Sequence, residues 1–433
     1  MHNTLHHIVI VGGGAGGLGL ATQLGHKLGK AKKAKITLID AHLTHIWKPL
    51  LHEVAAGTLN SFEDELNYFA HSVKHHFEFQ LGRMVDIDRS NKKLQLAPLS
   101  DEQGQQVAPA RAISYDTLVV AIGSTANDFG TQGARDNCIF LDSRPQADRF
   151  QQQFLNMYLQ AHALPADVSP PPELNVAIIG AGATGVELAA ELHHACHEFV
   201  RYGLDDIAPQ NVNITLIEAA DRVLPVLPPE VSAAAEAQLT AKGIKVLTKT
   251  KVLSIQAHHI DCDGGKQIAA DLKVWSAGIK APDFLQGIAG LETNRINQLV
   301  VKPSLQTTHD DAIFAFGDCA SCTLPHMERP VPPRAQSAQQ QANYLVKALA
   351  AHIQNKPLPV YKYSDFGSLI SLSHGSSVGN LVGNIHVKGR IARLMYVMLY
   401  RMHQYSLHGT LKTFVLWAKD QLSKNASPTL KLH

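Results

Sequence analysis

Two short apolar segments, each followed by a glycine-rich turn and then by a helix-forming run, dominate the pattern of hydrophobic and polar positions. Residues 8–11 are all Ile or Val and lead into the turn 12–17, and residues 176–179 lead into the turn 180–185. Apolar runs of this length, bounded by glycine, are typical of strands buried on both faces of a parallel sheet. The pattern therefore predicts an α/β fold that contains one strand–turn–helix unit twice.

The first turn has the spacing Gly12-x-Gly14-x-x-Gly17, and the next predicted strand, residues 36–39, ends in Asp40. In this arrangement the first glycine makes the tight turn, the second lets a pyrophosphate approach the backbone, and the third lets the helix pack against the strand. A phosphate bound there meets the positive end of the helix, and a carboxylate at the position of Asp40 accepts both ribose hydroxyls. A glycine-rich turn without a ligand is the alternative, but strand, helix and acid together favour a dinucleotide site.

The second turn repeats the spacing as Gly180-x-Gly182-x-x-Gly185, and its next strand ends in Glu218. The gap before this acid is longer than the usual interval of about 20 residues, which we attribute to a helix extension between residues 193 and 213. An acid at that strand end favours a free 2′-hydroxyl and repels a 2′-phosphate, so the sequence predicts NADH rather than NADPH. Two such turns suit an enzyme that holds FAD and a nicotinamide nucleotide. An old duplication with one inactive site is the alternative.

Two further apolar strands end in glycine. One passes through Ala121 to Gly123, and the other ends at Gly317, which Asp318 follows. A simple strand stop is common for glycine, but the Asp318 carboxylate could accept from a ribityl hydroxyl of a flavin. Together with the two turns, these strand ends resemble the two-dinucleotide-domain flavoprotein reductases, which have a glutathione-reductase-like fold with two Rossmann-like domains.

In that family the NADH domain interrupts the FAD domain, which resumes at the Gly-Asp motif. The resemblance implies an FAD-binding domain over residues 1–145 and 286–350 and an NADH-binding domain over residues 146–285. Residues 351–433 then form a C-terminal membrane-associating region. The Gln- and Pro-rich stretch 151–172 suits a hinge between the two nucleotide domains.

The five cysteines bear on the electron acceptor. An odd number scattered through a long chain argues against a secreted disulfide framework. Disulfide reductases and sulfide:quinone oxidoreductases of this build need reactive cysteines at the flavin, and the sequence has no such pair after the first glycine motif. Cys319 and Cys322 form a Cys-x-x-Cys motif, for which a redox role and two idle thiols both stay open. Because a single pair does not complete a structural zinc site, we predict no metal.

Four segments together resemble the type II NADH:quinone oxidoreductases, which are single-subunit respiratory enzymes, over essentially the whole chain. They are residues 47–57, 184–188, 275–282 and 335–340. The last segment fits the quinone-site pattern Ala-Gln-x-Ala-x-Gln of that family. The tail from residue 390 onward resembles the enterobacterial-type branch.

The resemblance implies roles for residues in these segments. Gln336 and Gln340 share one face of a predicted helix and would donate to a quinone carbonyl, unless they belong to a solvated, glutamine-rich face. Glu187 would lie near the stacked nicotinamide and flavin, and its alternative is a favourable acid in the first turns of a helix. The contacts implied for FAD also include Ala15, Lys48, Val85, Ala121, Gly123 and Ala335, and those implied for NADH include Thr184, Glu187, Ala277 and Gly278.

Charge and hydropathy change the picture at the C-terminus. The chain is 45% hydrophobic, but it has no run of about 18 apolar residues, so we expect no transmembrane helix and no direct proton pumping. Residues 388–433 carry eight Lys and Arg against the single acid Asp420, so this tail is +7 in a chain of net charge +2. Arg390, Arg393 and Arg401 fall on one stripe of a predicted amphipathic helix, which would lie in the headgroup region of an anionic membrane. A soluble helix that covers a domain core or a dimer interface is the alternative.

Residues and resemblance together predict an enzyme that oxidises NADH and reduces a quinone to quinol through non-covalently bound FAD, and so feeds a respiratory chain. The resemblance implies a peripheral, monotopic protein at the cytoplasmic face of the bacterial inner membrane; the N-terminal residues show no export signal. Its partners would be the bilayer surface and ubiquinone or menaquinone, with a homodimer left open and no nucleic acid expected. Two rival functions stay open: a soluble NADH-dependent reductase of ferredoxin or another small carrier, and a redox-sensing flavoprotein.

Overall fold

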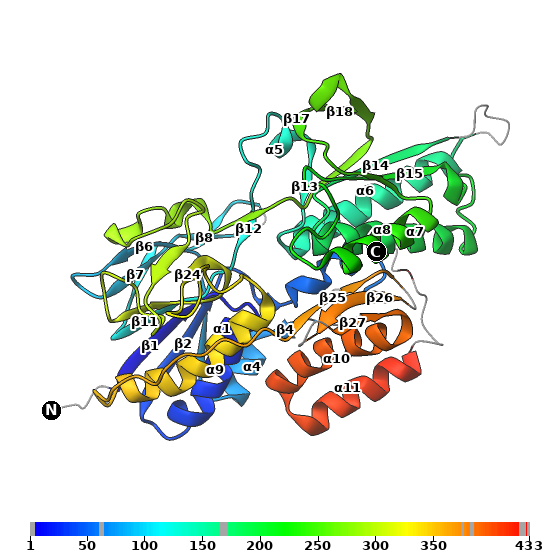
Figure 1. Cartoon of the computed structure of the whole chain (residues 1–433). Helices are drawn as coiled ribbons and strands as arrows, with labels where there is room; N and C mark the ends of the chain where they lie inside the picture. The colour runs from blue at the N-terminus through cyan, green and yellow to red at the C-terminus, as the bar shows by residue number, and fades with distance from the viewer. Residues whose placement is uncertain are drawn as a thin grey trace. The chain divides into compact units, whose positions relative to one another are not determined.

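The computed structural model of the chain describes residues 5–59, 65–101, 103–164, 172–373, 376–381, 385–423 and 430 (Figure 1). The chain folds into two compact units. Unit 1 consists of Met1–Trp47, Asp64–Thr125 and Ile279–Ser364, and unit 2 consists of Lys48–Glu63, Ala126–Gly278 and Asp365–His433. The assignment of FAD and NADH to separate domains stays a prediction.

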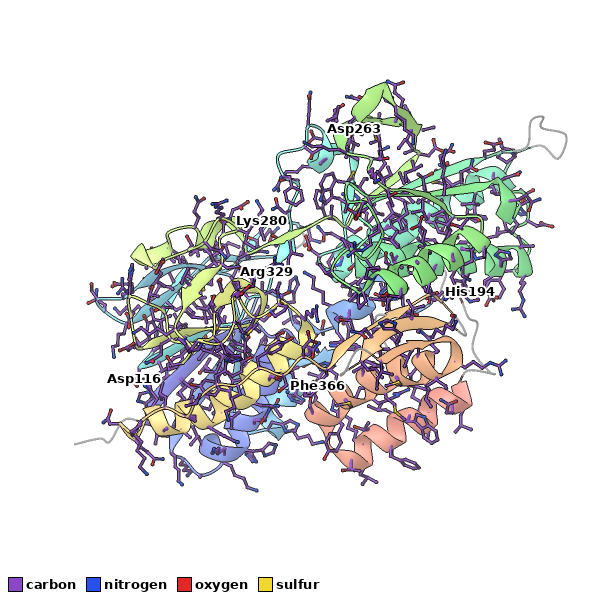
Figure 2. All side chains as sticks on the ribbon, in the orientation of Figure 1. Asp116, His194, Asp263, Lys280, Arg329 and Phe366 are labelled. Atoms are coloured by element: carbon purple, nitrogen blue, oxygen red, sulfur yellow. The ribbon has the colours of Figure 1, made fainter. Side chains whose placement is uncertain are left out.

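Unit 1 is built on a five-stranded parallel sheet with the strand order β23-β11-β1-β2-β5. The strands are β1 (His6–Val11), β2 (Ala34–Asp40), β5 (Glu78–Leu81), β11 (Thr117–Val120) and β23 (Ile313–Ala315). Asp116, which is labelled in Figure 2, lies just before β11. It accepts a hydrogen bond from the His7 N–H (2.7 Å) and so ties β11 to β1. The helices α1 (Ala15–Leu24) and α9 (Ala335–His352) pack against each other beside this sheet (Figure 1). A three-stranded antiparallel sheet of β6 (Met84–Asp88), β7 (Lys93–Leu96) and β10 (Arg111–Ser114) completes the core of the unit.

Unit 2 repeats this plan with the strand order β13-β20-β14-β15-β16, again all parallel. The strands are β13 (Ile139–Phe140), β14 (Leu174–Ile179), β15 (Val212–Ile217), β16 (Lys245–Leu247) and β20 (Leu272–Trp275), and the helices are α6 (Arg144–His162), α7 (Ala183–Arg201) and α8 (Pro229–Ala241). An antiparallel sheet of β17 (Val252–Ile255), β18 (His259–Cys262) and β19 (Gln267–Ala269) again accompanies the parallel one. Helix α7 extends to Arg201, which confirms that a longer helix fills part of the gap before Glu218.

The C-terminal part of unit 2 is a three-stranded antiparallel sheet covered by two helices, and the sequence did not predict this sheet. The strands are β25 (Gly367–Ser371), β26 (Ser377–Leu381) and β27 (Ile385–Lys388), and the helices are α10 (Gly389–His408) and α11 (Thr410–Ser423). Helix α10 packs on β25 and β26, and α11 packs on α10 (Figure 1). On its other side the sheet contacts α7 and α8. In the part of the chain that the structure describes, no helix has the length and apolar character needed to cross a membrane.

Short elements connect these layers. In unit 1 they include α4 (Tyr68–Lys74), and in unit 2 they include α2 (Leu51–Ala55) and α5 (Ala134–Asn137). The remaining strands and short 3-10 or π-helices of the described chain are η1 (Gly25–Gly29), β3 (Thr44–His45), η2 (Lys48–Leu50), β4 (Leu66–Asn67), β8 (Leu99–Ser100), β9 (Gln106–Ala108), β12 (Thr125–Ala126), η3 (Pro209–Asn211), η4 (Asp263–Gly265), β21 (Ile279–Lys280), η5 (Asp283–Leu285), η6 (Ile288–Gly290), β22 (Leu299–Val301), η7 (Gly317–Cys319) and β24 (Ala320–Cys322).

Two of the three arginines of the basic stripe of α10, Arg393 and Arg401, face the protein, which differs from the expectation that the stripe meets lipid headgroups; Arg390 is exposed. Arg401 donates to the Asp420 carboxylate on α11 (2.5 Å) and to the Gln404 side chain (2.7 Å), and Arg393 donates to the Ser371 hydroxyl (2.8 Å). Arg393 and Arg401 turn inward because their guanidinium groups find hydrogen-bond acceptors inside unit 2. The opposite face of the two helices is exposed and apolar; its members are Ile391, Leu394, Met398, Leu399, Met402, Tyr405, Leu411, Phe414, Val415, Trp417 and Leu422.

Candidate functional site

The first glycine turn joins β1 to α1 and has room for a ligand at one position only. A Cβ atom on Gly12, whose φ is +102°, would lie 2.3 Å from the Ala121 oxygen, and a Cβ on Gly17 would lie 1.8 Å from the Gly12 oxygen. The fold therefore requires glycine at both positions. A Cβ on Gly14 would meet nothing within 4 Å, so the backbone in front of α1 is open there, as a pyrophosphate requires.

Asp40, at the end of β2, lies against this turn. One carboxylate oxygen accepts from the Gly13 N–H (2.6 Å), and the other accepts from the His42 N–H (2.8 Å). The carboxylate also lies 3.2 Å from the His42 ring, and this hydrogen bond raises the pKa of His42. Asp40 is thus held against the first turn, and its role as a ribose acceptor stays a prediction.

The second turn, between β14 and α7, has the same construction. A Cβ on Gly180, at φ +101°, would lie 2.6 Å from the Ala277 backbone, one on Gly185 would lie 2.0 Å from the Gly180 oxygen, and one on Gly182 would meet nothing within 4 Å. Glu218, at the end of β15, accepts from the Ala181 and Ala220 N–H groups, each at 2.8 Å. In both turns, therefore, the fold requires glycine at the first and third positions and leaves the second glycine open. In both, backbone N–H groups also hold an acidic side chain beside the turn.

The Gly317–Asp318 strand end is held by residues that the sequence did not single out. Gly317 donates its N–H to the side chain of Gln341 on α9 (2.8 Å), which is buried. Ser124 donates to the Asp318 carboxylate (2.9 Å), and Gln298 donates to the Asp318 backbone oxygen (2.9 Å). Gln341 was missed because it belongs to a run of glutamines for which a solvated face was the alternative.

The two glutamines predicted to meet a quinone lie on α9 but differ in their surroundings. Gln340 donates to the Ser364 oxygen (2.8 Å) and accepts from the Ser364 N–H (3.0 Å). These two bonds attach Ser364, the last residue of unit 1, to α9. Gln336 is partly buried one turn earlier, beside Ala335, the exposed first residue of α9. The structure thus gives Gln340 a structural role beside any contact with a quinone, and the quinone contact of both residues stays a prediction.

Glu187 lies in a buried polar pocket of unit 2. Its carboxyl accepts from the Ser371 N–H on β25 (2.9 Å) and lies 3.6 Å from the His52 ring on α2. Burial, above all, raises the pKa of Glu187 to about 8, and burial lowers the pKa of His52 to about 4. At neutral pH the two groups are therefore a neutral pair rather than a salt bridge, and Glu187 keeps its proton.

More titratable groups surround this pair. Glu53 on α2 and Glu191 on α7 raise the pKa of Glu187 further, while Arg393 on α10 lowers it. Within the described chain, three buried polar atoms here lack a hydrogen-bond partner: His52 Nε2, Glu191 Oε2 and the Tyr396 hydroxyl. Buried polar atoms without partners, next to a carboxyl of shifted pKa, are typical of functional sites. The sequence predicted only Glu187. The members on α2 and α10 lie far away along the chain, and Glu191, one turn after Glu187 on α7, belongs to no motif that singled it out.

Two other residues that the resemblance implies at FAD belong to different units. Lys48 belongs to unit 2, where its ammonium group lies 3.4 Å from the Asp142 carboxylate, which also accepts from the Ala126 N–H (2.8 Å). Val85 lies on β6 of unit 1 with an exposed side chain. The role of both residues at FAD stays a prediction, as does the role of Thr184, Ala277 and Gly278 at NADH.

The Cys-x-x-Cys motif has the surroundings of idle thiols. Burial raises the pKa of Cys319 to about 12 and that of Cys322 to about 11, so both thiols stay protonated. Cys319 donates to the Phe316 oxygen (3.3 Å). Among the described residues, no group of three His, Cys, Asp or Glu side chains could hold a metal ion. The thiolate form that redox or metal chemistry needs is thus disfavoured.

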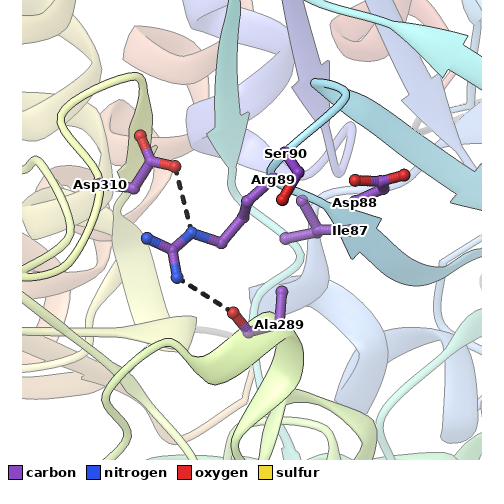
Figure 3. A pocket seen from close by; sticks show the side chains of 6 residues that line it. All are labelled: Ile87, Asp88, Arg89, Ser90, Ala289 and Asp310. Atoms are coloured by element: carbon purple, nitrogen blue, oxygen red, sulfur yellow. Dashed lines mark hydrogen bonds and ion pairs between the residues drawn. The ribbon is translucent and has the colours of Figure 1, made fainter.

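A surface pocket in unit 1 is lined by six residues but belongs to neither turn (Figure 3); they are Ile87, Asp88, Arg89, Ser90, Ala289 and Asp310. Arg89 crosses it and donates to the Asp310 carboxylate (3.1 Å) and to the Ala289 oxygen (3.2 Å). The guanidinium group of Arg89 is thus occupied by contacts within unit 1.

One family model and several sequence relatives match this chain. A family model described as pyridine nucleotide-disulphide oxidoreductase matches residues 6–342. The type II NADH:quinone oxidoreductase of Haemophilus influenzae is 45% identical, over 99% of this chain and 100% of the relative. The enzyme of the same name from Staphylococcus aureus is 30% identical, over 90% of this chain and 92% of the relative.

Two solved structures share the fold. NDH2 from Plasmodium falciparum in complex with NADH matches with a TM-score of 0.79 at 20% identity, over 93% of this chain and 96% of that chain. The sulfide:quinone oxidoreductase of Aquifex aeolicus matches with a TM-score of 0.72 at 18% identity, over 94% of this chain and 92% of that chain. The predicted flavoprotein fold is thereby confirmed. On the evidence of the sequence relatives, the chain belongs to the type II NADH:quinone oxidoreductases, within the pyridine nucleotide-disulphide oxidoreductase family.

Proposed function

We propose that this chain oxidises NADH and passes two electrons through non-covalently bound FAD to a membrane quinone, which becomes quinol. The observation that carries the proposal is the pair of glycine turns, each of which leaves its second glycine open and places an acid beside it. One such site serves one dinucleotide, so the chain has sites of the kind that two dinucleotides need. Membership of the family supports NADH and a quinone as the two substrates.

We assign FAD to the first turn. Gly14 leaves space for a pyrophosphate, Asp40 would accept from the adenosine ribose, and Asp318 would accept from the ribityl chain. When bound, FAD supplies the two-electron chemistry of the reaction, while the protein supplies binding, orientation and electrostatics. Gln341 fixes the Gly317 turn next to Asp318 and so supports the same site.

We assign NADH to the second turn. Glu218 is held at the turn by two N–H groups, and its charge repels a 2′-phosphate. We expect NADH to be strongly preferred over NADPH, and Glu218→Ala to narrow the ratio of the two kcat/KM values. Equal kcat/KM values for the two donors in the unsubstituted protein would refute the assignment.

The reaction consumes one proton from the medium, because the hydride of NADH supplies two electrons and one of the two hydrogens of the quinol. Glu187 is the group that we propose to hold this proton, since it is buried and still protonated at neutral pH. We propose that Gln336 and Gln340 on α9 both donate to the quinone; the amide of Gln340 also binds the Ser364 backbone.

The exposed apolar face of α10 and α11 supports docking on the cytoplasmic face of the bacterial inner membrane as a peripheral, monotopic protein. Four exposed basic residues would strengthen binding to anionic lipid. They are Lys388 and Arg390 at the start of α10, and Lys412 and Lys419 on α11. Docking of this kind would give a lipid-soluble quinone a route to the enzyme.

Steady-state assays with purified protein test the proposal against its rivals. We expect NADH-dependent turnover with a water-soluble ubiquinone or menaquinone analogue to exceed turnover with ferredoxin by orders of magnitude. Faster reduction of ferredoxin would favour a soluble carrier reductase, and slow turnover with every acceptor would favour a redox sensor. Mass spectrometry of the cofactor released by denaturation distinguishes FAD from FMN.

A further inference from the structure

A chain of two hydrogen bonds joins the helix with the exposed apolar face to Glu187. Arg393 on α10 donates to the Ser371 hydroxyl on β25 (2.8 Å). The N–H of the same serine donates to the Glu187 carboxyl on α7 (2.9 Å). Ser371 and Glu187 are both buried, so the bond between them does not compete with bulk water.

The groups that face Glu187 come from three helices. They are His52 and Glu53 on α2, Glu191 on the same helix as Glu187, and Arg393 and Tyr396 on α10. His52 is neutral at physiological pH because burial lowers its pKa. Among these described groups, Arg393 is therefore the permanent cation beside three carboxyls, and its guanidinium also lies 5.4 Å from the centre of the Tyr396 ring.

We propose that Arg393 is a positioning residue for the reaction, which holds Glu187 in place through Ser371 and thereby ties this carboxyl to helix α10. The inference rests on the role of Glu187 proposed above and extends it to a residue that does not touch substrate. Its charge acts as well: a nearby cation favours the ionised form of a carboxyl, and Arg393 lowers the pKa of Glu187 against the larger effect of burial.

The test compares the pH profiles of kcat and kcat/KM for the full-length, FAD-loaded protein with a water-soluble quinone analogue. Arg393→Met removes the charge but keeps much of the length of the side chain, and Arg393→Lys keeps the charge but loses the planar guanidinium. Arg201→Met is the matched control, because Arg201 is an exposed arginine at the end of the helix that carries Glu187. Thermal unfolding confirms that each variant is folded.

We expect Arg393→Met to move the ionisation seen in the profile to higher pH by about one unit, the lower end of the range for loss of an adjacent opposite charge. Arg393→Lys should restore most of this shift, and Arg201→Met should leave the profile in place. In a Glu187→Gln background, Arg393→Met should produce no shift. If Arg393→Met does not fold, Ser371→Ala, which removes the hydroxyl that accepts from Arg393, should shift the profile in the same direction.

A loss of activity without a shifted profile would give Arg393 a merely structural role and overturn the proposal. An equal shift in the Glu187→Gln background would also overturn it, because Arg393 would then act on another group. If Glu187→Gln itself changes neither turnover nor profile, the proposed role of Glu187 fails first, and this outcome is distinct from the other two.

Discussion

Replacing Glu187 by Gln should stabilise the protein at neutral pH while it impairs turnover. The amide oxygen of Gln can still accept from the Ser371 N–H, but the side chain cannot ionise. The pKa of Glu187 is about 8 in the folded protein, against an ordinary value of 4.5. Because the folded pKa is the higher one, the carboxyl costs no stability below pH 4.5, costs more as the pH rises to 8, and has a constant cost above pH 8.

The size of this effect follows from the shift. Each pKa unit corresponds to about 1.4 kcal/mol, so the cost removed by Glu187→Gln is about 3 kcal/mol at pH 7 and about 4 to 5 kcal/mol above pH 8. A difference of this size should raise Tm by several degrees. A residue that destabilises the folded protein is typical of a functional site, so the cost of burying Glu187 supports a functional role for it.

Thermal unfolding at pH 5, 7 and 8.5, with FAD at one fixed saturating concentration, measures the difference. Glu230→Gln, which removes an exposed carboxylate from α8, is the matched control and should show little change at any pH. A Glu187→Gln variant that is less stable at pH 7, or that gains equally at all three pH values, would refute the burial of a protonated carboxyl at this position.

Three further predictions follow from the geometry. Gly14→Ala should fold but retain little flavin, whereas Gly17→Ala should fail to fold, because only the methyl group added at Gly17 meets backbone atoms. Circular dichroism measures folding, and flavin absorbance measures bound flavin. Gln336→Leu should slow quinone reduction by about tenfold, the worth of a buried hydrogen bond, and leave flavin reduction by NADH intact, whereas Gln340→Leu should also lower Tm through the lost bonds to Ser364. Triple replacement of exposed apolar residues of α10 by Gln should release the protein from anionic vesicles in a sedimentation assay, while the fold stays intact; these residues are Leu394, Met398 and Met402.

The sequence predicted the parts of the fold that depend on neighbouring residues. The two glycine turns, the acids at the next strand ends and the longer α7 all follow from local spacing, because a βαβ unit is specified by consecutive residues. Glycine is also required at Gly12 and Gly180 by close backbone contacts that the family pattern encodes. These features could therefore be placed without knowledge of the rest of the chain.

Features that depend on distant partners could not be predicted. The periodicity of α10 predicted a stripe that contains Arg393 and Arg401, but it did not predict which face of the helix meets the protein. That face is set by Ser371 and Asp420, which accept hydrogen bonds from the two arginines. The sheet β25–β27 was missed for a similar reason, because its short strands are stabilised by packing on α7, α8 and α10. The polar surroundings of Glu187 likewise come from three separate stretches of the chain.

Anaerobic double-mixing stopped-flow spectroscopy tests the central claim most directly, because it follows donor, cofactor and acceptor in one experiment. NADH is mixed first with the purified protein, and a water-soluble quinone analogue is added after the visible flavin absorbance has been lost. We expect one equivalent of NADH to bleach one equivalent of flavin, and one equivalent of quinone to restore the absorbance within the turnover time. Flavin that NADH does not bleach, or that stays bleached after the quinone is added, would contradict the assignment of this chain as an NADH:quinone oxidoreductase.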